Sequence, residues 1–94
     1  MKNDQLISAL RQLRHHLRET LTAKVKDDQA GVAKNLDIAR EYVETVQFLM
    51  VDSTIAPELK LAALPTVKAI WTLKFTWRQR QLVKKLNEIL APYL

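Results

Sequence analysis

Residues 4–25, DQLISALRQLRHHLRETLTAKV, decide the fold that we expect for this chain. The spacing of their leucines, in steps of four, three, four and four residues, places one apolar stripe on one face of an α-helix. Asn3 or Asp4 can cap the start of this helix, because a short side-chain oxygen accepts a hydrogen bond from an unpaired backbone N–H. The stripe consists of Leu6, Leu10, Leu13, Leu17 and Leu21.

The composition favours helices along the whole chain. The chain has 94 residues, of which 48% are hydrophobic, with one glycine, three prolines and no cysteine. This length suits one domain, and so few turn residues favour a few long helices over many short strands. The absence of cysteine excludes disulfides and thiolate chemistry. We therefore expect a single helical domain over residues 1–94.

Two further helical segments follow the first. A turn at residues 26–31, KDDQAG, contains the only glycine and precedes a helix at 28–51, whose apolar residues alternate steps of four and three. Residues 57–71 are apolar but irregular, and Pro57 suits the first turn of a helix. Pro65 inside this segment predicts a kink or a break near residues 61–64, because proline removes a backbone hydrogen bond and crowds the preceding turn.

The last helix lies within residues 73–90, LKFTWRQRQLVKKLNEIL. Thr76 and Gln79 have the spacing of a capping box, in which each side chain bonds the backbone N–H of the other residue. Pro92 ends the helix. Leu82, Val83, Leu86, Ile89 and Leu90 form its buried face.

These segments predict an all-α fold, an antiparallel four-helix bundle whose third helix is kinked or broken near Pro65. The residues that we expect to be buried come from the apolar stripes of all four helices. They are Leu13, Leu17, Leu36, Val43, Val46, Leu64, Ile70, Leu82, Leu86 and Ile89.

The charge is distributed unevenly along the chain. Residues 1–26 carry six basic and two acidic side chains, residues 27–59 carry two and seven, and residues 60–94 carry seven and one. One interpretation is that neighbouring helices complement each other, with the acidic side chains of the second helix facing the stripe of Arg11, Arg14 and Arg18. The other interpretation is a functional basic surface.

Signatures of catalysis and metal binding are missing from the sequence. His15 and His16 are adjacent, so on a helix they point in different directions and cannot form a metal-binding pair at i, i+4. Asp37, Glu41 and Glu44 share a helix face but have no histidine beside them. No glycine-rich phosphate loop occurs. We expect no enzyme activity, no cofactor, no metal and no small-molecule substrate.

The candidate partner-binding residues lie in the first half of the last helix. A basic residue in the first turn of a helix opposes the macrodipole, so we expect that Arg78 and Arg80 are not placed there for helix stability. An exposed tryptophan beside arginines suits a membrane interface or a protein hot spot. Trp71 and Phe75, by contrast, are expected in the core. The candidates are Trp77, Arg78, Arg80, Lys84 and Lys85.

Residues 73–90 resemble the last-helix signature of the bacteriocin immunity proteins of lactic acid bacteria, the family that includes the enterocin A immunity protein. In that signature an aromatic-Thr pair opens the helix, a glutamine follows about three residues later, and leucines are spaced through a basic helix. Residues 35–49, NLDIAREYVETVQFL, are similar to the second helix of such proteins. The matching positions of the last helix are Phe75, Thr76, Gln79, Leu82, Val83, Leu86 and Leu90.

The resemblance implies a non-catalytic, cytoplasmic four-helix bundle that protects a producer cell from its own pore-forming class II peptide. It implies as partner a membrane receptor, a sugar phosphotransferase permease with bound bacteriocin, engaged from the inner membrane face. The C-terminal half would select the bacteriocin, which points to the five candidate residues. Peripheral contact with the anionic inner leaflet is a further expectation, because each nearby basic residue contributes about 1 kcal/mol there.

Two alternatives stay open, a basic helical nucleic-acid-binding protein and a helical adaptor for an unrelated protein partner. The sequence pI of about 9.8 fits an electrostatic footprint for nucleic acid. Against that interpretation, the connection at residues 72–75 is short and lacks the glycine turn of a helix-turn-helix. Nucleic acid is therefore not the partner that we expect.

Overall fold

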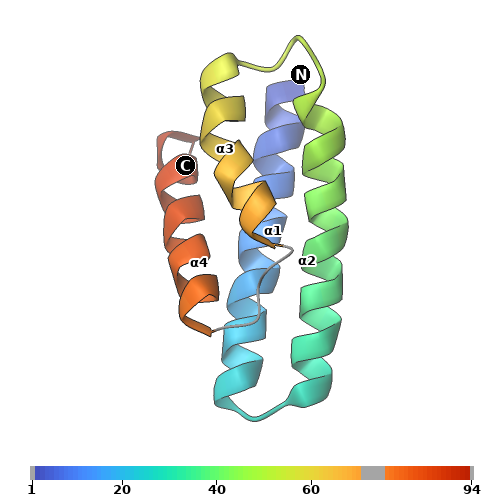
Figure 1. Ribbon diagram of the computed structural model, residues 1–94, viewed down its shortest axis with the longest axis vertical. Helices are drawn as coiled ribbons and strands as arrows, with labels where there is room; N and C mark the ends of the chain where they lie inside the picture. Colours follow the sequence, from blue (N-terminus) through green and yellow to red (C-terminus); the bar gives the residue numbers. More distant parts are fainter. Residues whose placement is uncertain (1, 71–75, 94) are drawn as a thin grey trace.

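Every element that the structure describes is a helix (Figure 1). The computed structural model describes the backbone of residues 2–70 and 76–93, and the side chains of residues 3–64 and 79–93. No strand occurs in these ranges, which confirms the all-α prediction for the described part of the chain. The elements there are α1 (Lys2–Val25), α2 (Gln29–Met50), α3 (Pro57–Ile70), α4 (Thr76–Leu90) and the 3₁₀ helix η1 (Ala91–Tyr93).

The helices pack side by side around one core (Figure 1). α1 packs against α2 and α4, and α3 contacts the same two helices. The longest dimension of the molecule, 42 Å, reflects the lengths of α1 and α2, since a helix of 24 residues is about 36 Å long. The radius of gyration is 13.0 Å, close to the ~13 Å expected of a folded chain of roughly 100 residues.

The leucine stripe of α1 lies in the core, as its spacing predicted. Four of its five members are fully buried, and Leu21 is partly buried against the same cluster. Six of the ten residues expected to be buried are confirmed, and Leu36 and Ile89 are partly buried. The six are Leu13, Leu17, Val43, Val46, Leu82 and Leu86.

The prediction for the inner face of α3 was wrong at Leu64, which is 39% exposed. α3 turns Leu59 and Ala63 inward instead. Successive residues of a helix lie about 100° apart, so Leu64 points away from the core that Ala63 faces. The expected burial of Ile70 lies outside the described side chains.

The turn between α1 and α2 is a Schellman motif. The N–H of Asp28 donates to the carbonyl of Ala23 at 2.8 Å, and the N–H of Asp27 donates to the carbonyl of Lys24 at 3.1 Å. Asp27 has a φ of 57°, the left-handed conformation that this motif requires and that glycine usually supplies. The glycine predicted to lie in the turn, Gly31, is inside the first turn of α2.

Asp28 caps the start of α2. Its Oδ1 accepts a hydrogen bond from the N–H of Gly31 at 3.0 Å. A Cβ at position 31 would collide with the Asp28 carboxylate and would lie 3.2 Å from the Cβ of Ala23. Glycine therefore allows the cap and the close approach of α1 at the same point.

The start of α1 is tied to the turn between α2 and α3. α1 begins at Lys2, so Asn3 and Asp4 both lie inside the helix, and the prediction that one of them caps it was wrong. Asn3 Oδ1 instead accepts a hydrogen bond from the N–H of Ala56 at 3.0 Å. Asp52 supports the same turn, because its Oδ1 accepts from the N–H of Thr54 at 2.8 Å.

α3 is one continuous helix (Figure 1) whose bounds include Pro65. Of the predicted kink or break near residues 61–64, the break is therefore wrong. Proline at this position removes the hydrogen bond to the carbonyl four residues earlier, that of Leu61. The side chain of Leu61 is 72% exposed, so this side of α3 faces solvent and water can bind the freed carbonyl. Pro57 occupies the first helical position, as predicted.

Candidate partner-binding face

The outer side of α4 carries three of the five candidate residues. Arg80, Lys84 and Lys85 are exposed, whereas the neighbouring Leu82 and Leu86 are buried. This separation follows from helical geometry, since residues three and four apart share a face. The structure therefore presents these three charges to solvent on a rigid element.

The other two candidates, Trp77 and Arg78, lie in the first turn of α4. Their side chains are outside the described residues, as are the predicted core positions Trp71 and Phe75. The basic face that the geometry supports is therefore defined by Arg80, Lys84 and Lys85.

The three basic residues of α4 point in two directions. Arg80 and Lys84 share a stripe with Asn87, at spacings of four and three residues. Asn87 contacts α1, so this stripe borders the seam between α1 and α4. Lys85 lies about 100° further round the helix than Lys84, on the side away from α1.

A second group of basic side chains meets this seam from α1. We call Arg11, Arg14 and Arg18 the arginine cluster. Arg14 Nη1 donates to Asn87 Oδ1 at 3.1 Å, and Arg18 Nη2 donates to the same oxygen at 2.9 Å. Arg11 donates to the backbone carbonyl of Tyr93 in η1. The basic surface thus spans α1 and α4 rather than α4 alone.

One of the two interpretations of the charge pattern, in which the acidic side of α2 faces the arginine cluster, was wrong for the described side chains. In the structure Asp37 pairs with Arg40 of its own helix at 3.7 Å, and Glu41 and Glu44 are exposed. The three-and-four spacing of the arginines, displaced to one side of the leucine stripe, predicts a shared face. It does not reveal which neighbouring helix that face meets.

The three positive charges of the arginine cluster repel one another, and Arg14 is also partly buried. Burial, followed by the charges of Arg18 and Arg11, lowers the pKa of Arg14. The acceptors that the guanidiniums reach, an amide oxygen and a backbone carbonyl, are both neutral. No carboxylate of the described side chains forms an ion pair with any of the three arginines.

The predicted capping box of α4 is incomplete. The Gln79 side chain is fully buried, and neither its Oε1 nor its Nε2 has a hydrogen-bond partner among the described atoms. The glutamine therefore does not return to the N–H of Thr76, which was the second half of the predicted box. The side chain of Thr76 lies outside the described residues.

The two histidines lie in different environments on α1. His15 is exposed, whereas His16 stacks on Tyr42 of α2 with ring centroids 5.8 Å apart. The Nδ1 of His16 is 3.0 Å from Asn35 Oδ1. Among the described residues no group of three or more side chains is arranged to hold a metal ion.

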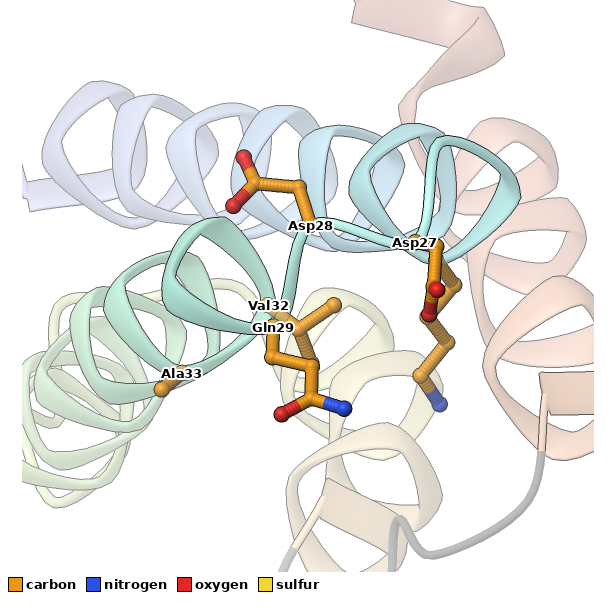
Figure 2. A pocket seen from close by; sticks show the side chains of 6 residues that line it. Asp27, Asp28, Gln29, Val32 and Ala33 are labelled. Atoms are coloured by element: carbon orange, nitrogen blue, oxygen red, sulfur yellow. The ribbon is translucent and has the colours of Figure 1, made fainter.

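A hollow lies beside the turn between α1 and α2 (Figure 2). Its polar side chains do not converge, because Asp28 points to the opposite side from Gln29 (Figure 2). The Asp28 carboxylate is also engaged in capping α2. The hollow is therefore an ordinary depression beside a turn. The basic surface along the seam between α1 and α4 is the better candidate for binding. Its lining residues are Lys24, Asp27, Asp28, Gln29, Val32 and Ala33.

Comparison with known proteins gives no relative from which a role can be taken. No family model, curated protein or solved structure matches the chain. None of the described helices is long and apolar enough to cross a bilayer. The function is therefore argued from the basic surface itself and from the resemblance of residues 35–49 and 73–90.

Proposed function

We propose that this protein is an immunity protein that protects a producer cell from a class II pore-forming bacteriocin. In this proposal the four helices form an antiparallel bundle in the cytoplasm. The bundle binds a membrane receptor, a sugar phosphotransferase permease with bound bacteriocin, at the inner membrane face. The protein performs no catalysis and acts by occupying that complex.

The observation that carries the proposal is the exposed basic side of α4, formed by Arg80, Lys84 and Lys85. It lies in the part of the chain that resembles the last helix of the immunity proteins. Buried leucines hold α4 against the core, so the basic side chains project from a fixed scaffold. A rigid helix face suits recognition of a protein partner, because little side-chain and backbone order must be gained on binding.

The distribution of charge over the rest of the surface supports a definite orientation of the protein toward the membrane. Asp37, Glu41 and Glu44 are exposed on α2. Arg80, Lys84 and the arginine cluster, by contrast, lie along the α1–α4 seam. The inner leaflet is anionic and attracts basic residues within about one Debye length. A protein with this distribution would turn its α1–α4 side toward the membrane and its acidic α2 side away.

Survival of a bacteriocin-sensitive lactic strain tests the proposal. Cells that express the protein would be exposed to a panel of class II peptides, and protection is expected against one or a few of them. The variant Arg80→Glu/Lys84→Glu should lose protection, while its fold survives because substitutions at exposed positions usually change stability little. The matched control, Lys26→Glu/Lys34→Glu, makes the same change in charge at exposed positions elsewhere.

The outcomes of this experiment separate the proposal from its rivals. Lack of protection by the wild-type protein against every peptide of the panel would reject the immunity function. Full protection by a folded Arg80→Glu/Lys84→Glu variant would remove this face from the mechanism. A thermal melt of each variant accompanies the survival assay, so that loss of the fold is recognised directly.

Nucleic-acid binding is the second candidate, favoured by the extension of the basic surface over two helices. It predicts an affinity for a DNA or RNA duplex that falls steeply with added salt, because counterions are released from the phosphates. Fluorescence anisotropy of a labelled duplex between low and physiological salt measures this dependence. A protein hot spot on α4 predicts no such binding to the duplex.

A further inference from the structure

The arginine cluster brings three positive side chains to one place, and no carboxylate among the described side chains pairs with them. Arg14 and Arg18 donate to the same neutral oxygen, Asn87 Oδ1, at 3.1 and 2.9 Å. Arg11 precedes Arg14 by three residues on the same face of α1 and donates to the Tyr93 carbonyl. Two guanidinium groups that share one acceptor repel each other at short range.

Neighbouring residues add to this positive charge. Arg80 and Lys84 are exposed on the α4 stripe that contains Asn87, on the side bordering α1. Glu19 follows Arg18 and Glu88 follows Asn87, but neither carboxylate forms an ion pair with the cluster. Nothing among the described side chains therefore neutralises this part of the seam.

Most N–H donors of Arg14 and Arg18 have no acceptor among the described contacts. Each guanidinium carries five N–H donors in a planar fork, and the described contacts of Arg14 and Arg18 use one acceptor between them. Arg14 is half-buried and Arg18 is exposed, so donors of both groups are within reach of a ligand from solvent. Charge-assisted bonds from such forks to an oxyanion are about twice as strong as neutral hydrogen bonds.

We propose that Arg11, Arg14 and Arg18 form a binding site for a phosphate group at the seam between α1 and α4. A phosphate group is tetrahedral, so its oxygens can accept from three guanidiniums that approach from different directions. A carboxylate is planar and is satisfied by one bidentate arginine. Arg80 and Lys84 of α4 border this site, but its ligating side chains come from α1, and the proposal does not depend on the proposed function.

The phosphate group has two possible sources, a soluble phosphate compound and a lipid headgroup. Inorganic phosphate, followed by its ³¹P resonance and by the melting temperature of the full chain, represents the first source. Vesicles of phosphatidylglycerol, with phosphatidylcholine vesicles as reference in a co-sedimentation assay, represent the second. All measurements are made at one ionic strength, set with sodium chloride.

The test compares two variants that lose the same number of charges. Arg14→Gln/Arg18→Gln removes the core of the site, and Lys34→Gln/Arg40→Gln removes two basic residues of α2. We expect the first variant to lose affinity for its phosphate probe by about tenfold or more. The loss of a single hydrogen bond to a charged group is enough for a change of this size. The α2 variant should change by less than about twofold, because screening weakens distant charges.

Each outcome decides the proposal. Loss of inorganic phosphate binding only in Arg14→Gln/Arg18→Gln supports a site for soluble phosphate, and the same pattern only with phosphatidylglycerol supports a headgroup site. Equal affinities of the two variants for both probes, or no binding by the wild-type protein, would overturn it. The fold should survive in Arg14→Gln/Arg18→Gln, because the substitution removes repulsion, and its thermal melt provides the check.

Discussion

Gln79 places an amide in the core without a hydrogen-bond partner among the described groups. A buried polar group in this state costs about 1–3 kcal/mol relative to a satisfied one. We expect Gln79→Met, which keeps the length of the side chain, to leave stability unchanged or raise it by about 1–2 kcal/mol. Urea denaturation measures the change, and Gln81→Met at an exposed position of the same helix is the control. A clear loss of stability in Gln79→Met would show that the amide is hydrogen-bonded in solution.

The two aspartates in the turn between α1 and α2 should change the stability of the protein in opposite directions when they are substituted. Asp27 adopts the left-handed conformation, which favours glycine, so Asp27→Gly should stabilise the protein by about 0.5–1 kcal/mol. Asp28 caps α2, so Asp28→Ala should destabilise it by about 1 kcal/mol. Melting temperatures of both variants under one condition test the assignment. Shifts in the same direction would contradict it.

These residues also show which side-chain roles a sequence can reveal. Asp28 could be predicted as a cap, because the preference for a short oxygen-bearing side chain is local. The roles of Asn3 and Gln79 could not, since each depends on what a distant segment brings near it. The side-chain oxygen of Asn3 accepts its hydrogen bond from the backbone N–H of Ala56, which lies 53 residues away in the sequence.

At the scale of elements, α3 carries a proline in its interior and remains one helix. Pro65→Ala would restore the hydrogen bond to the carbonyl of Leu61, and we expect a gain of about 1–3 kcal/mol. Pro57→Ala at the first helical position is the matched control and should have little effect, since no intrahelical bond is missing there. Chemical denaturation of both variants measures the difference. A stability loss in Pro65→Ala would mean that proline is required at this point of α3.

The positions of the helices were predictable because each depends on local spacing. The leucine stripe of α1 and the apolar steps of α2 gave their bounds to within a few residues. The inner face of α3 was not predictable in the same way, because Leu61 and Leu64 break the period without changing the composition. The helix that meets the arginine cluster also depends on packing between elements.

At the scale of the whole molecule, one apolar cluster joins all four helices. Leu86 of α4 is fully buried in it, and Leu86→Ala should cost about 2–5 kcal/mol through lost burial and a residual cavity. This is a large part of the ~5–15 kcal/mol that stabilises a typical domain. Thermal unfolding tests the prediction against Leu61→Ala, whose side chain is mostly exposed. Equal melting temperatures for the two variants would contradict the assigned core.

The net charge of +5 does not show how the basic and acidic residues are distributed over the folded molecule. The sequence predicted basic ends around an acidic middle, and two interpretations were open for it. Helix packing places the arginine cluster of α1 and the basic stripe of α4 along one seam. The described contacts therefore contradict the first interpretation. The second, a functional basic surface, stays a prediction.

The hydrogen bond from the Ala56 N–H to Asn3 Oδ1 has a consequence for solvent exchange. Backbone amides just before a helix usually lack a partner and exchange their protons quickly with water. The amide of Ala56 should exchange slowly for as long as the first turn of α1 stays folded against it. Asn3→Ala would then release this one proton while leaving most amides within α2 unchanged. Deuterium uptake at Ala56 thus reports, from the middle of the chain, whether its beginning is in place.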